Sequence, residues 1–447
     1  MTVRKMLLAS LAAALWASAP VPGLAQDAPP ETAGESDPAS LPDDGSQDAL
    51  LQTRAEQIVA VLKGDRPASD VFSAGFLGAV SPEQLTALAA QMEDQFGTLA
   101  GVDSVTPTGK GSAIVALRYE RAIARGRMEL APDSGQLVNG LLFNDFETLD
   151  DSVAAVTSDI AALPGQVSVL YAPLDRWQEP IIAIEPDRQM AIGSAFKLYV
   201  LSDLAHAAAK GEIGWDQLVR LDRRSLPSGR MQDWPQQTPV SVATLAIMMI
   251  SISDNTATDQ LIALLGRDSL AGEVRASGHS APDRMLPFLS TLELFALKGD
   301  TERGGLYAAA SEEEQAQILA TLDSETGGDA RNIAPPTFAE PHAIDTLEWF
   351  ASANDLRGVL ERIQQLDEPI ARDILAVNPS LTAPMREKWA YVGFKGGSEP
   401  GVLNLSWLLQ DKSGAWFVLV LSWNDPDAPL DNSRLELLAQ RILGLKR

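Results

Sequence analysis

The chain has 447 residues, enough for about three domains of ordinary size. Hydrophobic residues make up 45% of it and charged residues 21%, a globular composition that excludes wholesale disorder. Cysteine is absent and the three histidines have no metal-ligand spacing, so we expect no disulfide, no metal and no other cofactor. The formal net charge of −25 repels phosphate backbones, and no nucleic-acid partner is expected.

Residues 1–25 have the features of a cleaved signal peptide. Basic residues at positions 4 and 5 precede a mostly apolar run, and Gly23-Leu24-Ala25 supplies small residues for cleavage. The alternative is a membrane anchor, but the apolar run is short for a bilayer span. Residues 26–47 hold four prolines, six acids and no base, which predicts an acidic, Pro-rich linker. We therefore expect a secreted or periplasmic protein.

Residues 48–147 predict a small α+β domain. Helical spacing indicates a helix over 49–63, and Ser81-Pro82-Glu83-Gln84 has the pattern of a capped helix start. Three strands are expected near 112–120, 127–131 and 137–143. No polar cluster indicates a second active site, so we assign this domain a role in binding, docking or dimerisation.

The region 150–447 has strand patterns at both ends and helices between them. A helix over 150–162 precedes strands at 166–172 and 180–185, and a helical middle extends to about residue 374. Strands at 391–394, 402–410 and 416–423 and a helix over 432–445 close the chain. This order predicts a helix-covered antiparallel sheet beside a helical lobe, with a cleft as the natural site.

Three short motifs in this region carry chemistry. Ser194-Ala195-Phe196-Lys197 opens a helix, so that Ser194 and Lys197 share a face and a desolvated lysine amine can act on the hydroxyl. Ser253-Asp254-Asn255 separates two helices, and its plain alternative is helix capping. Lys395-Gly396-Gly397-Ser398 follows a strand, where glycines allow close backbone approach; its plain alternative is a turn.

The order S-x-x-K, S-D-N and K-[T/G]-G resembles class A β-lactamases and penicillin-binding proteins over residues 150–447. The whole chain is similar to a subgroup of secreted serine hydrolases that join an N-terminal steroid-isomerase-like (NTF2-like) domain to a β-lactamase-like domain. One member of that subgroup belongs to clavulanic acid biosynthesis.

The resemblance implies a role for each motif residue. Ser194 is the acylated nucleophile, Lys197 its base and Ser253 the proton relay to the leaving group. Lys395 adds positive potential, and Asn255, Gly397 and Ser398 bind substrate. Backbone N–H groups of Ser194 and Ser398 form the oxyanion hole.

The sequence departs from the family pattern at two places. Gly396 stands where threonine or serine is common, which affects carboxylate recognition. The E-x-x-L-N stretch that carries the deacylating glutamate is absent, and Glu293 is the nearest candidate for that base. Residues 300–341 are an insertion, which is interpreted as a surface addition or a lid.

Three functions follow as hypotheses. The first is an exported acyl-serine hydrolase, an esterase or weak β-lactamase, acting on a small-molecule ester or a β-lactam. The second is a D-alanyl-D-alanine carboxypeptidase acting on peptidoglycan-derived acyl substrates. The third is a non-catalytic binding protein on the same fold.

Overall fold

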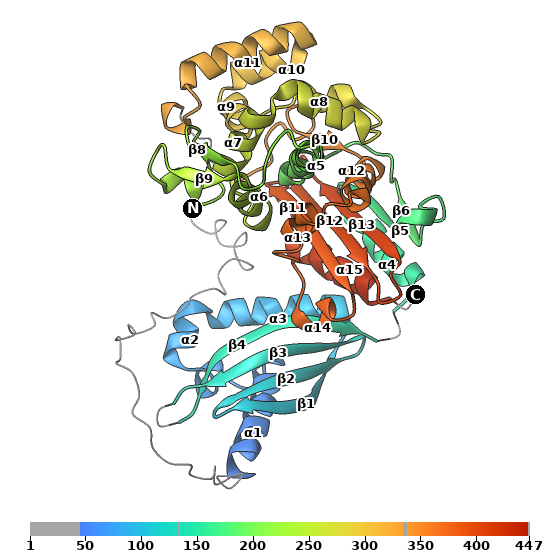
Figure 1. Cartoon of the computed structure of the whole chain (residues 1–447). Coiled ribbons are helices and arrows are strands. Elements are labelled where there is room, and N and C mark those ends of the chain that lie inside the picture. The colour runs from blue at the N-terminus through green and yellow to red at the C-terminus, as the bar shows by residue number, and fades with distance from the viewer. Residues whose placement is uncertain (1–44, 133–134, 150, 334–337, 446–447) are drawn as a thin grey trace, which may run out of the picture. The chain divides into compact units, whose positions relative to one another are not determined.

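A computed structural model describes residues 45–445 except 133–134, 150 and 334–337 (Figure 1). The chain divides into two compact units, the first ending at Asp151 and the second beginning at Ser152. The predicted signal peptide and residues 26–44 of the predicted linker lie outside the described residues. No helix within the described ranges has the length and apolarity needed to cross a bilayer.

The first unit combines three helices with one antiparallel sheet. Its elements are α1 (Gly45–Leu62), α2 (Ala74–Ala79), α3 (Pro82–Phe96), β1 (Leu99–Gly109), β2 (Ser112–Tyr119), β3 (Ala122–Leu130) and β4 (Val138–Thr148), and the strands follow in the order β1-β2-β3-β4. The predicted capping box at the start of α3 is confirmed, because Ser81 and Gln84 exchange hydrogen bonds. Strand β1 was not predicted, since most of its residues are exposed and lack an apolar alternation. The NTF2-like assignment stays a prediction.

The second unit is built on a five-stranded antiparallel sheet in the order β11-β12-β13-β5-β6. Its strands are β5 (Gln166–Pro173), β6 (Ile182–Ile184), β11 (Tyr391–Glu399), β12 (Val402–Gln410) and β13 (Trp416–Asn424). Both ends of the region therefore supply strands, as predicted. The Lys395 motif lies inside β11, whereas we expected it beyond the strand's end.

Helices cover both faces of this sheet (Figure 1). Alternating residues of β5 face opposite ways, so Leu170 belongs to the core with α5 (Lys197–Ala209) and α12 (Ala353–Gln365). Its neighbour Tyr171 belongs to the core with α4 (Val153–Ala161) and α15 (Asn432–Gly444). The sheet is therefore buried on both sides, and α5, which begins at Lys197 of the S-x-x-K motif, packs against it.

The helical middle forms the rest of the second unit. It contains α6 (Val242–Ser251), α7 (Asn255–Leu265), α8 (Arg267–Ala276), α9 (Thr291–Gly299), α10 (Thr301–Ala309), α11 (Glu312–Thr326), α13 (Ile370–Leu375) and α14 (Ala383–Arg386). Two short strand pairs join it, β7 (Met190–Ala191) with β10 (Phe350–Ala351), and β8 (Leu218–Arg220) with β9 (Pro239–Ser241). In the insertion, Leu319 and Leu322 of α11 are buried in the core. Its described residues do not line the cavity that holds the three motifs.

Candidate active site

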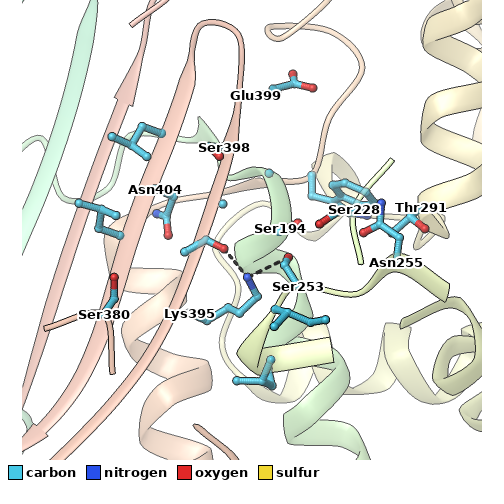
Figure 2. A pocket seen from close by; sticks show the side chains of 18 of the residues that line it. Ser194, Ser228, Ser253, Asn255, Thr291, Ser380, Lys395, Ser398, Glu399 and Asn404 are labelled. Atoms are coloured by element: carbon cyan, nitrogen blue, oxygen red, sulfur yellow. Dashed lines mark hydrogen bonds between the residues drawn. The ribbon is translucent and has the colours of Figure 1, made fainter. Parts of the chain in front are cut away.

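The three motifs meet at one cavity of about 450 Å³ in the second unit (Figure 2). Ser194 comes from a 3₁₀ turn, Gly193–Phe196, that leads into α5. Ser253 and Asn255 come from the junction of α6 and α7, and residues 395–398 come from β11. The three segments, separated by about 60 and 140 residues in the sequence, therefore line the same cavity. The order of the motifs alone does not require this.

Glycine permits the nucleophile turn to lie directly on β11. A Cβ added at Gly397 would lie 2.1 Å from Ile192 O and 2.5 Å from Ser194 N, distances that no side chain tolerates. A Cβ added at Gly193, which has φ +47°, would lie 3.1 Å from Ser398 N. The backbone amides of Ser194 and Ser398 thus lie on adjoining segments, which is the arrangement an oxyanion hole needs.

Lys197 is fully buried beneath this turn. Its Nζ donates to Ser253 O (2.7 Å), Ser253 Oγ (3.0 Å) and Asn255 Oδ1 (2.7 Å). Burial, and then the positive charge of Lys395, lower the pKa of Lys197 well below its ordinary value, against the opposing effect of Asp259 and Asp254. In the neutral form Lys197 donates only to Ser253 O and Asn255 Oδ1, and its lone pair accepts from the Ser253 hydroxyl. The site favours this form, which can accept a proton.

Lys395 approaches the same serine from β11. Its Nζ donates to Ser253 Oγ (3.1 Å) and to Gly396 O (2.5 Å), and burial lowers its pKa to about 7 (Figure 2). Ser253 itself has φ +57°, a left-handed conformation that is uncommon outside glycine. The junction therefore holds the Ser253 hydroxyl between two lysines at the cost of local backbone strain.

The neighbours of Ser253 fix the junction. The buried carboxylate of Asp254 accepts from Ala257 N as the N-cap of α7, and also from Arg230 N and Met231 N. The capping interpretation is thus correct for Asp254. Asn255 accepts from Lys197 and donates one Nδ2–H to Leu226 O (3.2 Å), which leaves one N–H for a substrate.

Steric crowding explains why glycine stands at position 396 in this structure. A Cβ added there would lie 2.9 Å from the ring of Phe394 and 3.1 Å from Asn404 O. The aromatic ring occupies the space that a threonine side chain would need. Ser398 lies beside it and is exposed at the cavity.

Glu293 does not occupy the position of a deacylating base. One carboxylate oxygen accepts from Ser290 N (2.8 Å), closing a capping box, and the other accepts from Arg267. Its side chain is 5% exposed and is not among the described residues that line the cavity. The candidate role in water activation is therefore corrected to a structural one at the start of α9.

A buried charged cluster at the cavity was not predicted from the sequence. Lys298 Nζ donates to Glu348 Oε1 (2.8 Å) and to Glu399 Oε1 (2.5 Å), and both glutamates line the cavity. Trp349 lies beside Glu348 and stacks on Phe196 at 3.7 Å between ring centroids. Only Glu399 is near a motif, directly after Ser398. Lys298 and Glu348 carry no local pattern that reveals them.

The histidines and acids do not form a metal centre within the described ranges, where no group of three or more such side chains converges. His206 packs in the last turn of α5, and its Nδ1 lies 2.8 Å from Ser202 O. Its role is structural.

A protein-family model and several solved structures are similar to part of this chain. Residues 148–331 match the model of the β-lactamase enzyme family. No curated protein matches the chain. Similar solved structures include a β-lactamase from Sphaerobacter thermophilus, with 19% identity, 65% of this chain and 93% of that chain covered, and a TM-score of 0.44.

Two further structures give similar values. PBP-A has 15% identity, with 65% of this chain and 92% of that chain covered and a TM-score of 0.44. A β-lactamase from Chitinophaga pinensis has 15% identity, with 65% and 96% covered and a TM-score of 0.44. The match to the β-lactamase enzyme family thus covers residues 148–331, which lie mainly in the second unit with its mixed helices and sheet.

Proposed function

We propose that this protein is a serine hydrolase that forms an acyl-enzyme on Ser194. The observation that carries the proposal is that Ser194, Ser253 and Lys395 line one cavity, while the buried Lys197 contacts Ser253 from beneath it. The pKa values of both lysines are lowered. A non-catalytic binding protein has no use for two desolvated lysines around one hydroxyl, because burying an amine costs stability.

The residues supply a balanced acyl-transfer step. Ser194 Oγ attacks the substrate carbonyl carbon, and its proton passes to the neutral amine of Lys197. The bond to the leaving group then breaks, and Ser253 Oγ gives that group a proton, which Lys197 replaces across their 3.0 Å contact. The amides of Ser194 and Ser398 stabilise the negative charge on the carbonyl oxygen.

Deacylation lacks an evident base. Both oxygens of Glu293 and both oxygens of Glu348 accept hydrogen bonds. Glu399 lies two residues beyond Gly397, which is the part of β11 against the Ser194 turn. We therefore propose an esterase or a slow β-lactamase, whose acyl-enzyme hydrolyses slowly. The same feature favours a D-alanyl-D-alanine carboxypeptidase as the second candidate, since a peptidase of this type is held by penicillin as a long-lived adduct.

Intact-protein mass spectrometry tests the proposal. The protein is mixed with benzylpenicillin, a chromogenic cephalosporin or a 4-nitrophenyl ester, beside the Ser194→Ala variant. We expect an adduct that is absent in the variant. Turnover of the ester indicates an esterase, and D-alanine release from muropeptides with a persistent penicillin adduct indicates the peptidase. No adduct with any probe would overturn the acyl-serine proposal.

We further propose that the protein is exported and that the first 25 residues are removed. The mass of the protein recovered from the periplasm or medium tests this. The expected mature chain begins at Gln26, and a full-length chain retained in the membrane fraction would contradict the proposal.

A further inference from the structure

Acidic groups outnumber basic ones at the cavity. Among the described residues that line it, the carboxylates are Glu348, Glu399 and Glu436, whereas Lys395 is the one cationic side chain. Lys395 is already engaged with Ser253 and Gly396. A substrate that enters this space therefore meets little positive charge beyond the proton-transfer residues.

Glu399 is the member of the buried cluster that faces the cavity. The side chains of Lys298 and Glu348 are 0% and 1% exposed, and that of Glu399 is 12% exposed. Both oxygens of Glu348 accept hydrogen bonds, from Lys298 and from Trp349 N (3.0 Å). The three groups sum to one negative charge when all are ionised, and Glu399 is the most exposed of the three, at the edge of the cavity (Figure 2).

The strand direction indicates which part of a substrate reaches Glu399. Lys395, Gly397 and Glu399 alternate along β11 and so point to one face of the sheet. Lys395 contacts Ser253, the proposed proton donor to the leaving group, and Gly397 lies against Ser194 N. Glu399 follows Lys395 by four residues, about 13 Å along the strand. The acyl group, opposite the leaving group, therefore extends toward Glu399.

We infer that this site takes acyl groups that carry an ammonium, and that the carboxylate of Glu399 receives it; the inference rests on the acyl-serine function proposed above. Burial, and then the neighbouring charge of Glu348, raise the pKa of Glu399 above its ordinary value. Glu399 thus retains its proton to higher pH than an ordinary carboxyl, and ammonium binding releases that proton. The preference for an ammonium must grow as pH rises.

Three 4-nitrophenyl esters of similar length test the inference. They are the esters of 6-aminohexanoic acid, heptanoic acid and adipic acid, which end in an ammonium, a methyl group and a carboxylate. The acylation rate of Ser194 is measured at pH 6.5 and pH 9, where the ammonium, with a pKa near that of lysine, stays charged. Rates with Ser194→Ala are subtracted as background.

We expect the ammonium ester to react about tenfold faster than the methyl ester at pH 9, because a charge-assisted hydrogen bond exceeds a neutral contact. The ratio is smaller at pH 6.5, and the carboxylate ester is the slowest. Glu399→Gln brings the ratio close to one at both pH values. Glu313→Gln makes the same charge change on α11, away from the cavity, and keeps the ratio.

Glu399→Gln leaves Lys298 paired with Glu348, so we expect the variant to fold, and a melting curve checks this. Equal rates for the ammonium and methyl esters with wild-type protein would overturn the inference while leaving the acyl-serine proposal intact. A ratio that survives in Glu399→Gln would also overturn it. If none of the esters acylates Ser194, the proposed function fails, and the inference with it.

Discussion

The amines of Lys197 and Lys395 both contact Ser253 Oγ, at 3.0 and 3.1 Å. Two ammonium groups on one hydroxyl repel each other, and the charge of Lys395 is one cause of the lowered pKa of Lys197. The serine can donate its own proton only to a lysine that has lost one. The pair therefore favours one neutral amine, which is the form needed to take the proton of Ser194.

Replacing Lys395 with methionine is expected to make acylation less effective near neutral pH. The change removes a positive charge, so the pKa of Lys197 rises and less of it is neutral at pH 7. The ascending limb of the acylation rate against pH moves to higher pH, with a loss of about tenfold at pH 7. Stopped-flow acylation by a chromogenic ester measures this limb.

The control for that experiment is Lys395→Arg, which keeps a permanent positive charge beside Lys197. Its ascending limb should stay near that of the wild type. An unmoved limb in Lys395→Met would refute the electrostatic coupling of the two lysines.

The same substitution has a second consequence, for stability. Lys395 titrates near pH 7 in the folded protein and near 10.4 when unfolded. Between these values the unfolded chain binds a proton that the folded chain does not, so the free energy of unfolding rises with pH. Below pH 7 the full penalty of the buried charge applies.

Lys395→Met removes that penalty and should raise the free energy of unfolding by about 1–3 kcal/mol at pH 6. The gain shrinks toward pH 10, where the wild-type lysine is neutral when folded. Urea unfolding at several pH values measures the difference. A variant less stable than the wild type at pH 6 would contradict the argument.

Gly397→Ala is expected to destroy the site. Its Cβ would lie 2.1 Å from Ile192 O, so the nucleophile turn must move away from β11. We expect a loss of about 3 kcal/mol or more in stability and no detectable acylation. Melting curves and the penicillin adduct report the two effects separately.

Gly396→Ala on the same strand is the matched control. Its nearest neighbour is the end of the Phe394 side chain at 2.9 Å, which is able to shift. We expect a cost of about 1 kcal/mol with acylation retained. Equal effects of Gly397→Ala and Gly396→Ala on stability and acylation would show that close approach at Gly397 is not what the site requires.

Glu293→Gln separates a structural role from a catalytic one. The variant loses the ion pair with the partly exposed Arg267 and keeps one acceptor for Ser290 N, so we expect a cost of about 1 kcal/mol. The lifetime of the acyl-enzyme, followed by mass, should be unchanged. A lifetime at least tenfold longer would return Glu293 to the role of base.

Local patterns in the sequence were sufficient to predict several structural elements. The strands β12 and β13, the capped start of α3 and the capped junction at Asp254 depend on neighbours in the chain, and they follow the prediction. The extension of β11 to Glu399 was missed because two glycines suggested its end. Its pairing with β12 continues through both of them.

Other features depend on contacts between distant segments. Glu293 resembled a base by position in the sequence, and only its contact with Arg267, 26 residues earlier, shows what it binds. Lys298, Glu348 and Glu399 come from three segments up to about 100 residues apart. The hydrogen bonds among these three side chains depend on tertiary packing, which a single sequence does not reveal.

The strand order of the second unit has a consequence for how the chain assembles. Strand β5, complete by residue 173, hydrogen-bonds to β13, which ends at Asn424. Until the last strands are available, one edge of β5 has no native partner. The Ser194 turn likewise has no β11 to lie on. Pairings this distant slow folding, so the cavity around Ser194 forms only after the C-terminal strands have paired.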